Sequence, residues 1–348
     1  MMHTGRAAPI FPGMTAPLTL RDIFARIPEQ ALGLIDFYQA LMRGPSPLSA
    51  GERELIYAYG SNAAGCRFCY MSHSRCAIEL GIRSDAFALP PEQIGQAAQK
   101  AGNGPLLRYA VALAVHGSAG PLTRPDDMES LSVEGRIDAL LVSGLTAYIN
   151  RIIEGLGAYS SDEQHARNGL NLARFGYAQV RADVQQGLLA AGHACPAPWP
   201  PAAQAVPPRL APRCLLLQWL DSYQQLVLAG PSGVPAWLRL AIRQGTLPRA
   251  ATHATAAAPQ DAPPATEPAH RCALTFAHRL VHTPCTSTPE DIAQLFAHGW
   301  TAKDVIDLVI TAATTALCMR VQTGLYECGL AGDWSAEPGP ALKYAARQ

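Results

Sequence analysis

The feature that most constrains this chain is an internal duplication of a helical unit. Residues 34–56 (LIDFYQALMRGPSPLSAGERELI) align with 219–242 (WLDSYQQLVLAGPSGVPAWLRLAI), with one residue of slippage. Farther along, 136–156 (RIDALLVSGLTAYINRIIEGL) aligns with 305–325 (VIDLVITAATTALCMRVQTGL). Two long copies are too few for a solenoid. The sequence therefore predicts a helical domain that occurs twice in tandem.

Local patterns agree with an all-α fold. Apolar residues recur every three to four positions, and alternating runs rich in Val, Ile and Tyr are nearly absent. A capping box formed by Ser49 and Glu52 is expected to start one of the helices. The helices expected in the first copy span 19–43 (one or two helices), 50–62, 66–80, 91–101, 104–116, 126–131 and 133–156.

Two stretches interrupt this helical pattern. Residues 194–212 contain seven prolines, and residues 248–268 are rich in Ala and Pro with few bulky apolar side chains. The first stretch predicts a semi-rigid linker, and the second a loosely packed or disordered segment. We therefore expect a first domain at 18–157, a helical and proline-rich linker at 158–212, and a degenerate second copy at 213–331.

Charge and hydropathy exclude several classes of protein. Lys and Arg total 27 and Asp and Glu total 27, so the formal net charge is zero and no basic footprint marks a nucleic-acid or anionic membrane partner. No apolar run approaches the roughly 18 residues of a membrane-spanning helix, and the N-terminal residues lack the apolar core of a signal peptide. We expect a cytoplasmic protein with neither a membrane nor a nucleic-acid partner.

Residues that carry chemistry gather in one segment of the first copy. Cys66 and Cys69 form the only C-x-x-C motif of the chain, a spacing that indicates redox chemistry or half a zinc site. No second C-x-x-C or H-x-x-x-H pairs with it in this half, as a four-ligand zinc site requires. His73 follows on the same helix face, and Glu54 on the preceding helix can turn back beside it. A carboxylate, an imidazole and a thiol in series form a proton relay.

The second copy lacks all four of these side chains. At the same offset their positions are occupied by Leu240, Thr252, Thr255 and Pro259. Whatever chemistry the first copy performs, the second has therefore lost. Since helix N-termini stabilise thiolates, position alone indicates Cys66, the cysteine nearer to the helix end, as the more acidic thiol.

Other residues near the motif have plainer expected roles. Cys76, Tyr57 and Tyr59 are expected to pack in the core. Asp138 and Arg151 recur in the second copy, which has no cysteine pair, so a structural role is expected for both.

The order of Glu, eleven residues, C-x-x-C, three residues and His resembles the active-site signature of the alkyl hydroperoxidase D (AhpD)-like branch of the carboxymuconolactone decarboxylase superfamily. The likeness covers most of 19–157 and, more weakly, 213–330. One departure is Phe68, which stands where mycobacterial-type members carry a histidine. The chain is thus more similar to the broader peroxidase-related subgroup.

The resemblance implies tandem all-α domains and a thiol-dependent alkyl hydroperoxidase or disulfide oxidoreductase. By this resemblance Cys69 is the thiolate that attacks the peroxide, and Cys66 then closes a redox disulfide with it. Glu54 and His73 would relay the protons. No organic cofactor or metal is required.

The resemblance also implies partners. The substrate would be a peroxide and the electron donor an external dithiol, which in the family can be a lipoyl carrier; a peroxiredoxin can be the oxidant. Single-domain members assemble as trimers and hexamers. A chain with two copies therefore predicts a homo-oligomer with half as many chains, such as a trimer.

Two other functions stay open. A decarboxylase-type member of the superfamily would use acid–base chemistry, and its C-x-x-C would be superfluous. A non-catalytic assembly or ligand-binding module would carry a vestigial dithiol, which the degenerate second copy allows. Thiol titration separates the three, because only a dithiol peroxidase predicts a fast-reacting thiol pair that cycles reversibly.

Overall fold

The computed structural model describes residues 9–11, 13–87, 132–193, 211–244, 267–283 and 287–327. Within these ranges the chain forms twelve α-helices, one short 3-10 helix and no strand, which confirms the all-α prediction. None of these helices is long and apolar enough to cross a membrane. The helices expected at 91–101, 104–116 and 126–131 lie outside the described residues, as do the two proline-rich stretches except for their last two residues.

The N-terminal helices begin where the sequence predicts. Residues 19–43 form two helices, α1 (Leu20–Arg26) and α2 (Pro28–Arg43). Helix α3 (Ala50–Ala63) starts from the predicted capping box: the Ser49 amide donates to the Glu52 carboxylate, and the Glu52 amide donates to the Ser49 hydroxyl. Two donors at the helix end are thereby satisfied.

Helix α4 (Arg67–Glu79) folds back along α3 as a helical hairpin. The turn requires Gly65, whose φ of 79° lies in the left-handed region that side chains disfavour. Cys66 is the residue that precedes the first turn of α4. The hairpin thus places the C-x-x-C helix beside the helix that carries Glu54.

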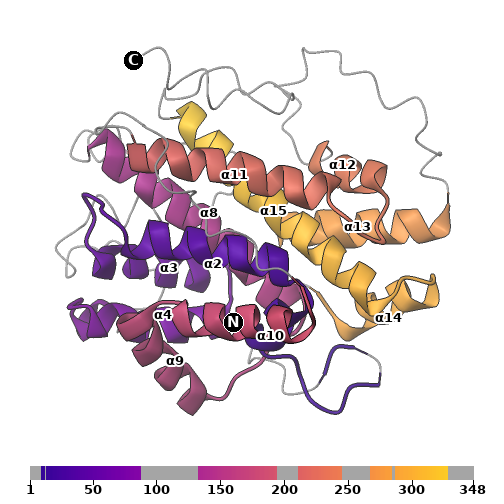
Figure 1. The fold of residues 1–348 in the computed structure, drawn as a ribbon, viewed down its shortest axis with the longest axis horizontal. Coiled ribbons are helices and arrows are strands. Elements are labelled where there is room, and N and C mark those ends of the chain that lie inside the picture. Colours follow the sequence, from indigo (N-terminus) through magenta and orange to yellow (C-terminus); the bar gives the residue numbers. More distant parts are fainter. Residues whose placement is uncertain are drawn as a thin grey trace.

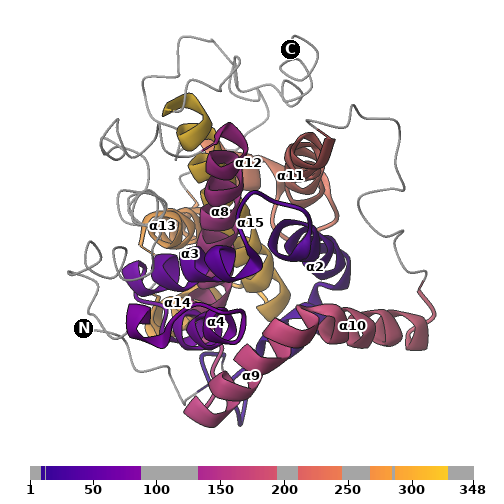
Figure 2. The same ribbon diagram turned by 90° about the vertical axis from the view of Figure 1, so that its left-hand side faces the viewer.

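Two long helices form the centre of the molecule. Helix α8 (Val133–Gly155) packs against α15 (Ala302–Glu327), and both are buried along nearly their whole described length; Figures 1 and 2 show the two side by side. The remaining elements are η1 (Ser84–Phe87), α9 (Asp162–Phe175), α10 (Ala178–Ala190), α11 (Ala211–Ala229), α12 (Ala236–Gln244), α13 (Pro268–His282) and α14 (Pro289–Ala297).

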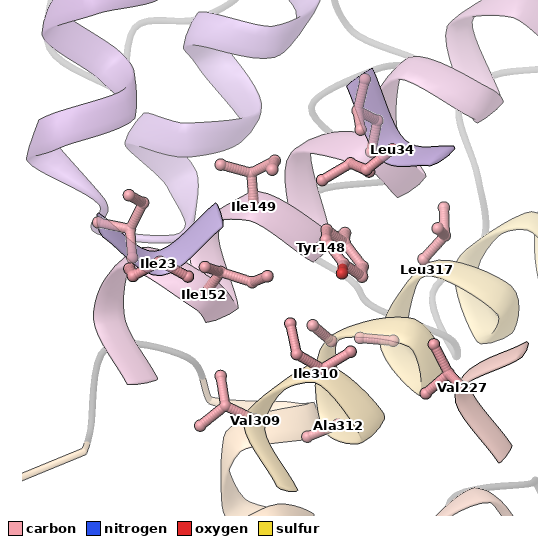
Figure 3. Close-up of a cluster of buried hydrophobic side chains, with 14 of the residues drawn as sticks. Ile23, Leu34, Tyr148, Ile149, Ile152, Val227, Val309, Ile310, Ala312 and Leu317 are labelled. Atoms are coloured by element: carbon pink, nitrogen blue, oxygen red, sulfur yellow. The ribbon is translucent and has the colours of Figure 1, made fainter. Parts of the chain in front are cut away.

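The buried apolar side chains of both halves belong to one continuous cluster. In Figure 3, Tyr148 of α8 points toward Ile310 and Leu317 of α15. Its hydroxyl lies 2.6 Å from that of Tyr223 on α11, so even the polar tip is satisfied inside the core. The two halves therefore share a core.

The turn after α2 and the turn after α11 have the same hydrogen bonds. Ser46 donates to Asp138 at 2.5 Å, and in the second half Ser232 donates to Asp307 at 2.6 Å. The sequence alignment pairs Ser46 with Ser232 and Asp138 with Asp307. Asp138 and Asp307 thus each tie a long central helix to the turn before the next helix.

A buried arginine repeats in the same way. Arg53 donates to the carbonyl of Leu41 at 2.5 Å, and Arg239 donates to the carbonyl of Val227 at the same distance. Both arginines close the C-terminal end of the preceding helix, where carbonyl groups lack partners. These equivalent contacts favour the interpretation of a duplicated unit.

The contact between α8 and α15 is reciprocal. A Cβ on Gly155 of α8 would lie 3.0 Å from Val309 of α15, and a Cβ on Gly324 of α15 would overlap Leu140 of α8. The alignment pairs Gly155 with Gly324 and Leu140 with Val309, so exchanging the copies exchanges the two contacts. Such reciprocity is the property of an isologous interface between two like subunits.

Residues 158–193, which the sequence assigned to a connecting segment, form α9 and α10 and pack onto the first copy. Helix α9 lies along α4, and α10 lies against α2. Arg181 of α10 donates to Asp36 of α2 at 2.6 Å in a largely buried ion pair. This segment is therefore a covering layer of the first copy.

We expect Gly169→Ala to separate α9 from α4. The added Cβ would lie 2.5 Å from Arg75 Cβ and 2.7 Å from the Ser72 carbonyl oxygen, which belongs to helical backbone. The strain should destabilise the fold by about 1–3 kcal/mol in urea titrations, despite the better helix propensity of alanine. Gly187→Ala on α10 is the control, since its Cβ meets nothing within 4 Å; a stability gain of up to ~1 kcal/mol is expected there. Equal effects of the two changes would contradict the close α4–α9 contact.

Candidate active site

The four residues singled out by the sequence come together in the α3–α4 hairpin, and all are buried. Glu54 Oε2 lies 2.5 Å from His73 Nδ1. The thiols of Cys66 and Cys69 lie within hydrogen-bonding reach of each other, and both are free. The hairpin thus holds a carboxylate–imidazole pair and a dithiol on one short segment.

Glu54 is held as an anion in spite of its burial. Burial alone raises the pKa of this carboxyl group, but the His73 imidazole, the Arg43 guanidinium and the Tyr38 hydroxyl stabilise the carboxylate and lower the pKa to about 2. A carboxylate only accepts hydrogen bonds, so Nδ1–H of His73 is the donor in their contact. The other ring nitrogen, Nε2, can then take up a proton.

Tyr38 and Arg43 of α2 complete the environment of Glu54, and sequence reasoning did not assign either of them to the site. Tyr38 donates to Glu54 Oε1 at 2.7 Å, and Arg43 Nη2 lies 2.7 Å from the same oxygen. One signal could have identified Arg43. The second copy has Ala229 at the position of Arg43 and Leu240 at that of Glu54. The second half thus lacks both members of the buried ion pair. This is expected, because either charge buried without its partner would destabilise the fold.

The two thiols differ in their surroundings. Burial raises the pKa of the Cys66 thiol well above its ordinary value, and the adjacent Cys69 raises it further. Removal from water therefore opposes the lowering of the Cys66 pKa that its helix-end position alone indicates. Cys69, in the first turn of α4, lines a cavity, and Cys66 does not. The geometry makes Cys69 the thiol that a ligand reaches.

The cavity beside Cys69 and His73 has a volume of about 340 Å³. Its walls come from α1, α4, α8, α9 and α10, so two of them depend on the segment that covers the first copy. Its buried apolar lining consists of Ile149, Leu172 and Tyr177. Side-chain amides of α9 and α10 lie at more exposed positions: Gln164, Asn168, Asn171 and Gln179. A small organic molecule with an apolar part fits this lining.

Phe68 forms a wall between this cavity and a second one of about 250 Å³. Its ring and that of His165 on α9 form a T-shaped contact, with ring centroids 5.0 Å apart. Burial lowers the pKa of His165 below its ordinary value. Position 68 thus forms an apolar partition, with a histidine from another helix behind it.

Several residues expected to have plain roles can now be placed. Tyr59 donates to the carbonyl of Ala86, which ties α3 to η1. Arg151 donates to the carbonyl of Ala147 at 2.8 Å, a structural bond within α8. Tyr57 differs from the expectation of simple packing, because its ring stacks on that of His73 with centroids 3.6 Å apart. A buried aromatic ring thus fixes the plane of the imidazole.

Cys76 lies beside the buried pair of Glu54 and Arg43. Arg43 Nη2 is 3.5 Å from Cys76 Sγ, and burial raises the pKa of this thiol above its ordinary value. Cys76 does not line the cavity. Its position agrees with the expected packing role.

In the parts of the chain that the structure describes, no three His, Cys, Asp or Glu side chains are grouped in a way that could hold a metal ion. No protein-family model matches the chain, and no curated protein matches it. The resemblance to the AhpD-like branch therefore rests on the motif and its helical surroundings.

Proposed function

We propose that the chain is a thiol-dependent alkyl hydroperoxidase of the AhpD-like type, with a catalytic first copy and a degenerate second copy. One observation carries the proposal: Cys69 and His73 line the same cavity, while Cys66 and Glu54 lie behind them. The nucleophile and its base thus face the substrate, and the resolving thiol and the carboxylate support them.

The first step is the oxidation of Cys69. Nε2 of His73 takes the thiol proton while Glu54 holds Nδ1–H at 2.5 Å. The thiolate attacks an oxygen of the hydroperoxide; the S–O bond forms as the O–O bond breaks. The alkoxide takes the proton from His73 and leaves as an alcohol. The sulfur is thereby oxidised by two electrons to a sulfenic acid.

The second step closes the disulfide. The Cys66 thiol, within hydrogen-bonding reach of Cys69, attacks the sulfenic sulfur and releases water. An external dithiol then reduces the disulfide through a mixed disulfide. Since Cys69 lines the cavity and Cys66 does not, this dithiol enters through the cavity and attacks Cys69.

The chemistry of the cavity supports an organic hydroperoxide as substrate, because apolar side chains line its buried part. A lipoyl carrier is the proposed dithiol, a peroxiredoxin the alternative oxidant, and a homotrimer the proposed assembly. The free thiols among the described cysteines suit a reducing compartment such as the cytoplasm.

The test is peroxide-dependent disulfide formation in the full chain. With tert-butyl hydroperoxide, mass spectrometry is expected to find a Cys66–Cys69 disulfide that dihydrolipoamide reverses. Before oxidation, an alkylating reagent should modify Cys69, which lines the cavity, faster than Cys66, which does not. Two thiols that stay reduced under peroxide would contradict the peroxidase and favour a decarboxylase-type enzyme or a non-catalytic module.

A further inference from the structure

The Tyr57 side chain is fully buried next to the relay and leaves its polar atom unused. Its ring lies on the His73 ring at an interplanar angle of 17°. Its hydroxyl has no hydrogen-bond partner among the described residues. A buried hydroxyl without a partner carries its full desolvation penalty, so such a group in a native site calls for a functional reason.

Cys69 lies four residues before His73 on α4, and both line the same cavity, so the ring that stacks on His73 lies close to the reactive thiol. Burial raises the pKa of Tyr57 well above its ordinary value, and a charge on Cys69, the strongest of the neighbouring groups, raises it further. Cys66 acts in the same direction. The hydroxyl therefore keeps its proton and is available as a hydrogen-bond donor.

The second copy supports a role in the chemistry. Tyr38, which binds Glu54 but also packs in the core, has a counterpart in Tyr223. Tyr57 has none: its position is occupied by Arg243. The copy that lacks the cysteine pair thus also lacks this tyrosine.

We propose that the Tyr57 hydroxyl donates a hydrogen bond to the oxygen that the peroxide adds to Cys69. This inference rests on the proposed function. In the reduced enzyme the hydroxyl has no partner within the described parts of the chain. Oxidation supplies one, since the sulfenic oxygen is the only atom that the first step adds to the protein. The bond holds the sulfenic acid until Cys66 attacks the sulfur, and the oxygen then leaves as water. Tyr57 itself gains or loses no electrons.

The test uses Cys66→Ser, in which the sulfenic acid on Cys69 has no resolving thiol. After two equivalents of tert-butyl hydroperoxide, the first to form the sulfenic acid and the second able to oxidise it to sulfinic acid, dimedone added at intervals measures how long the sulfenic acid survives. Tyr57→Phe in this background is expected to shorten its half-life about tenfold, the effect of one lost hydrogen bond. Sulfinic acid on Cys69 should rise in step.

Tyr59→Phe is the matched control, because it makes the same change on the same buried helix. Its hydroxyl donates to the Ala86 carbonyl, away from the thiols. Tyr59→Phe should lower the thermal unfolding midpoint and leave the half-life unchanged. Tyr57→Phe removes no existing hydrogen bond, so its unfolding midpoint should equal or exceed that of the parent.

Three outcomes would overturn the inference. An unchanged half-life in Tyr57→Phe would leave the peroxidase standing but remove Tyr57 from it. A short half-life together with a midpoint as low as that of Tyr59→Phe would assign Tyr57 a structural role. If Cys66→Ser itself formed no sulfenic acid, the proposed function would fail and this inference with it.

Discussion

Cys69→Ser is expected to reduce peroxide consumption by about a thousandfold or more, whereas Cys66→Ser should still reduce the first equivalent of peroxide and then stop. A serine hydroxyl in place of Cys69 cannot act as a thiolate nucleophile or be oxidised to a sulfenic acid. Loss of Cys66 removes only the second step, because Cys66 lies behind Cys69 and does not line the cavity. Single-turnover peroxide consumption, followed by peroxide assay against enzyme concentration, measures both effects.

Cys318→Ser is the control for losing a buried thiol. Cys318 lies in α15 of the second half, and burial raises its pKa to about 12. This variant should consume peroxide at the rate of the unmodified chain. The opposite pattern, with Cys66 essential for the first equivalent and Cys69 dispensable, would exchange the roles of the two cysteines.

The sequence predicted the parts of the site that depend on local structure. The capping box at Ser49 and the left-handed turn at Gly65 set the ends of two helices joined by a short turn. That hairpin is sufficient to bring Glu54 of one helix to His73 of the other. Sequence spacing is a good guide here because only a few residues separate the elements.

The parts that were missed depend on packing between distant segments. Arg43 contacts Glu54 from α2, and Tyr177 lines the cavity from the turn between α9 and α10. The segment with α9 and α10 was assigned to a linker because a proline-rich stretch follows it. The burial that raises the pKa of Cys66 likewise comes from the surrounding helices. Helix position predicts a low thiol pKa only where the thiol remains in contact with water.

The alignment of the copies paired α8 with α15 but did not show that the two helices touch. Their reciprocal contacts, Gly155 with Val309 and Gly324 with Leu140, resemble an interface between two subunits brought into one chain. The aligned second half has no counterpart of Glu54 or of the cysteine pair, but it contributes its long helix to this contact. Its apolar face is part of the core around the first copy.

Glu54→Gln is expected to lower both peroxide reduction and stability. Glutamine keeps the shape of the side chain but removes the charge that holds Nδ1–H of His73 and neutralises Arg43. Loss of the relay should reduce the rate of Cys69 oxidation by about a hundredfold or more. Loss of the carboxylate leaves a largely buried guanidinium without its partner, which should destabilise the fold by about 3 kcal/mol. Peroxide assays and urea titrations measure the two effects separately.

The pH dependence of stability gives an independent check. The pKa of Glu54 is about 2 in the folded chain, compared with 4.5 for the free side chain. Because the folded value is the lower one, the stabilisation is fully present above pH 4.5 and is lost as the pH falls toward 2. This difference corresponds to about 3 kcal/mol, so the unmodified chain should lose that much more stability between pH 5 and pH 2 than Glu54→Gln.

Glu52→Gln is the control that distinguishes an effect at the Glu54 site from a general effect on helix α3. The change is the same, two residues earlier in α3, and a glutamine oxygen can still accept from the Ser49 amide in the capping box. Its activity and its stability at pH 7 should stay close to those of the unmodified chain. If Glu54→Gln lost stability as expected but oxidised Cys69 at the full rate, Glu54 would be a structural partner of Arg43. His73 would then take the thiol proton without a carboxylate behind it.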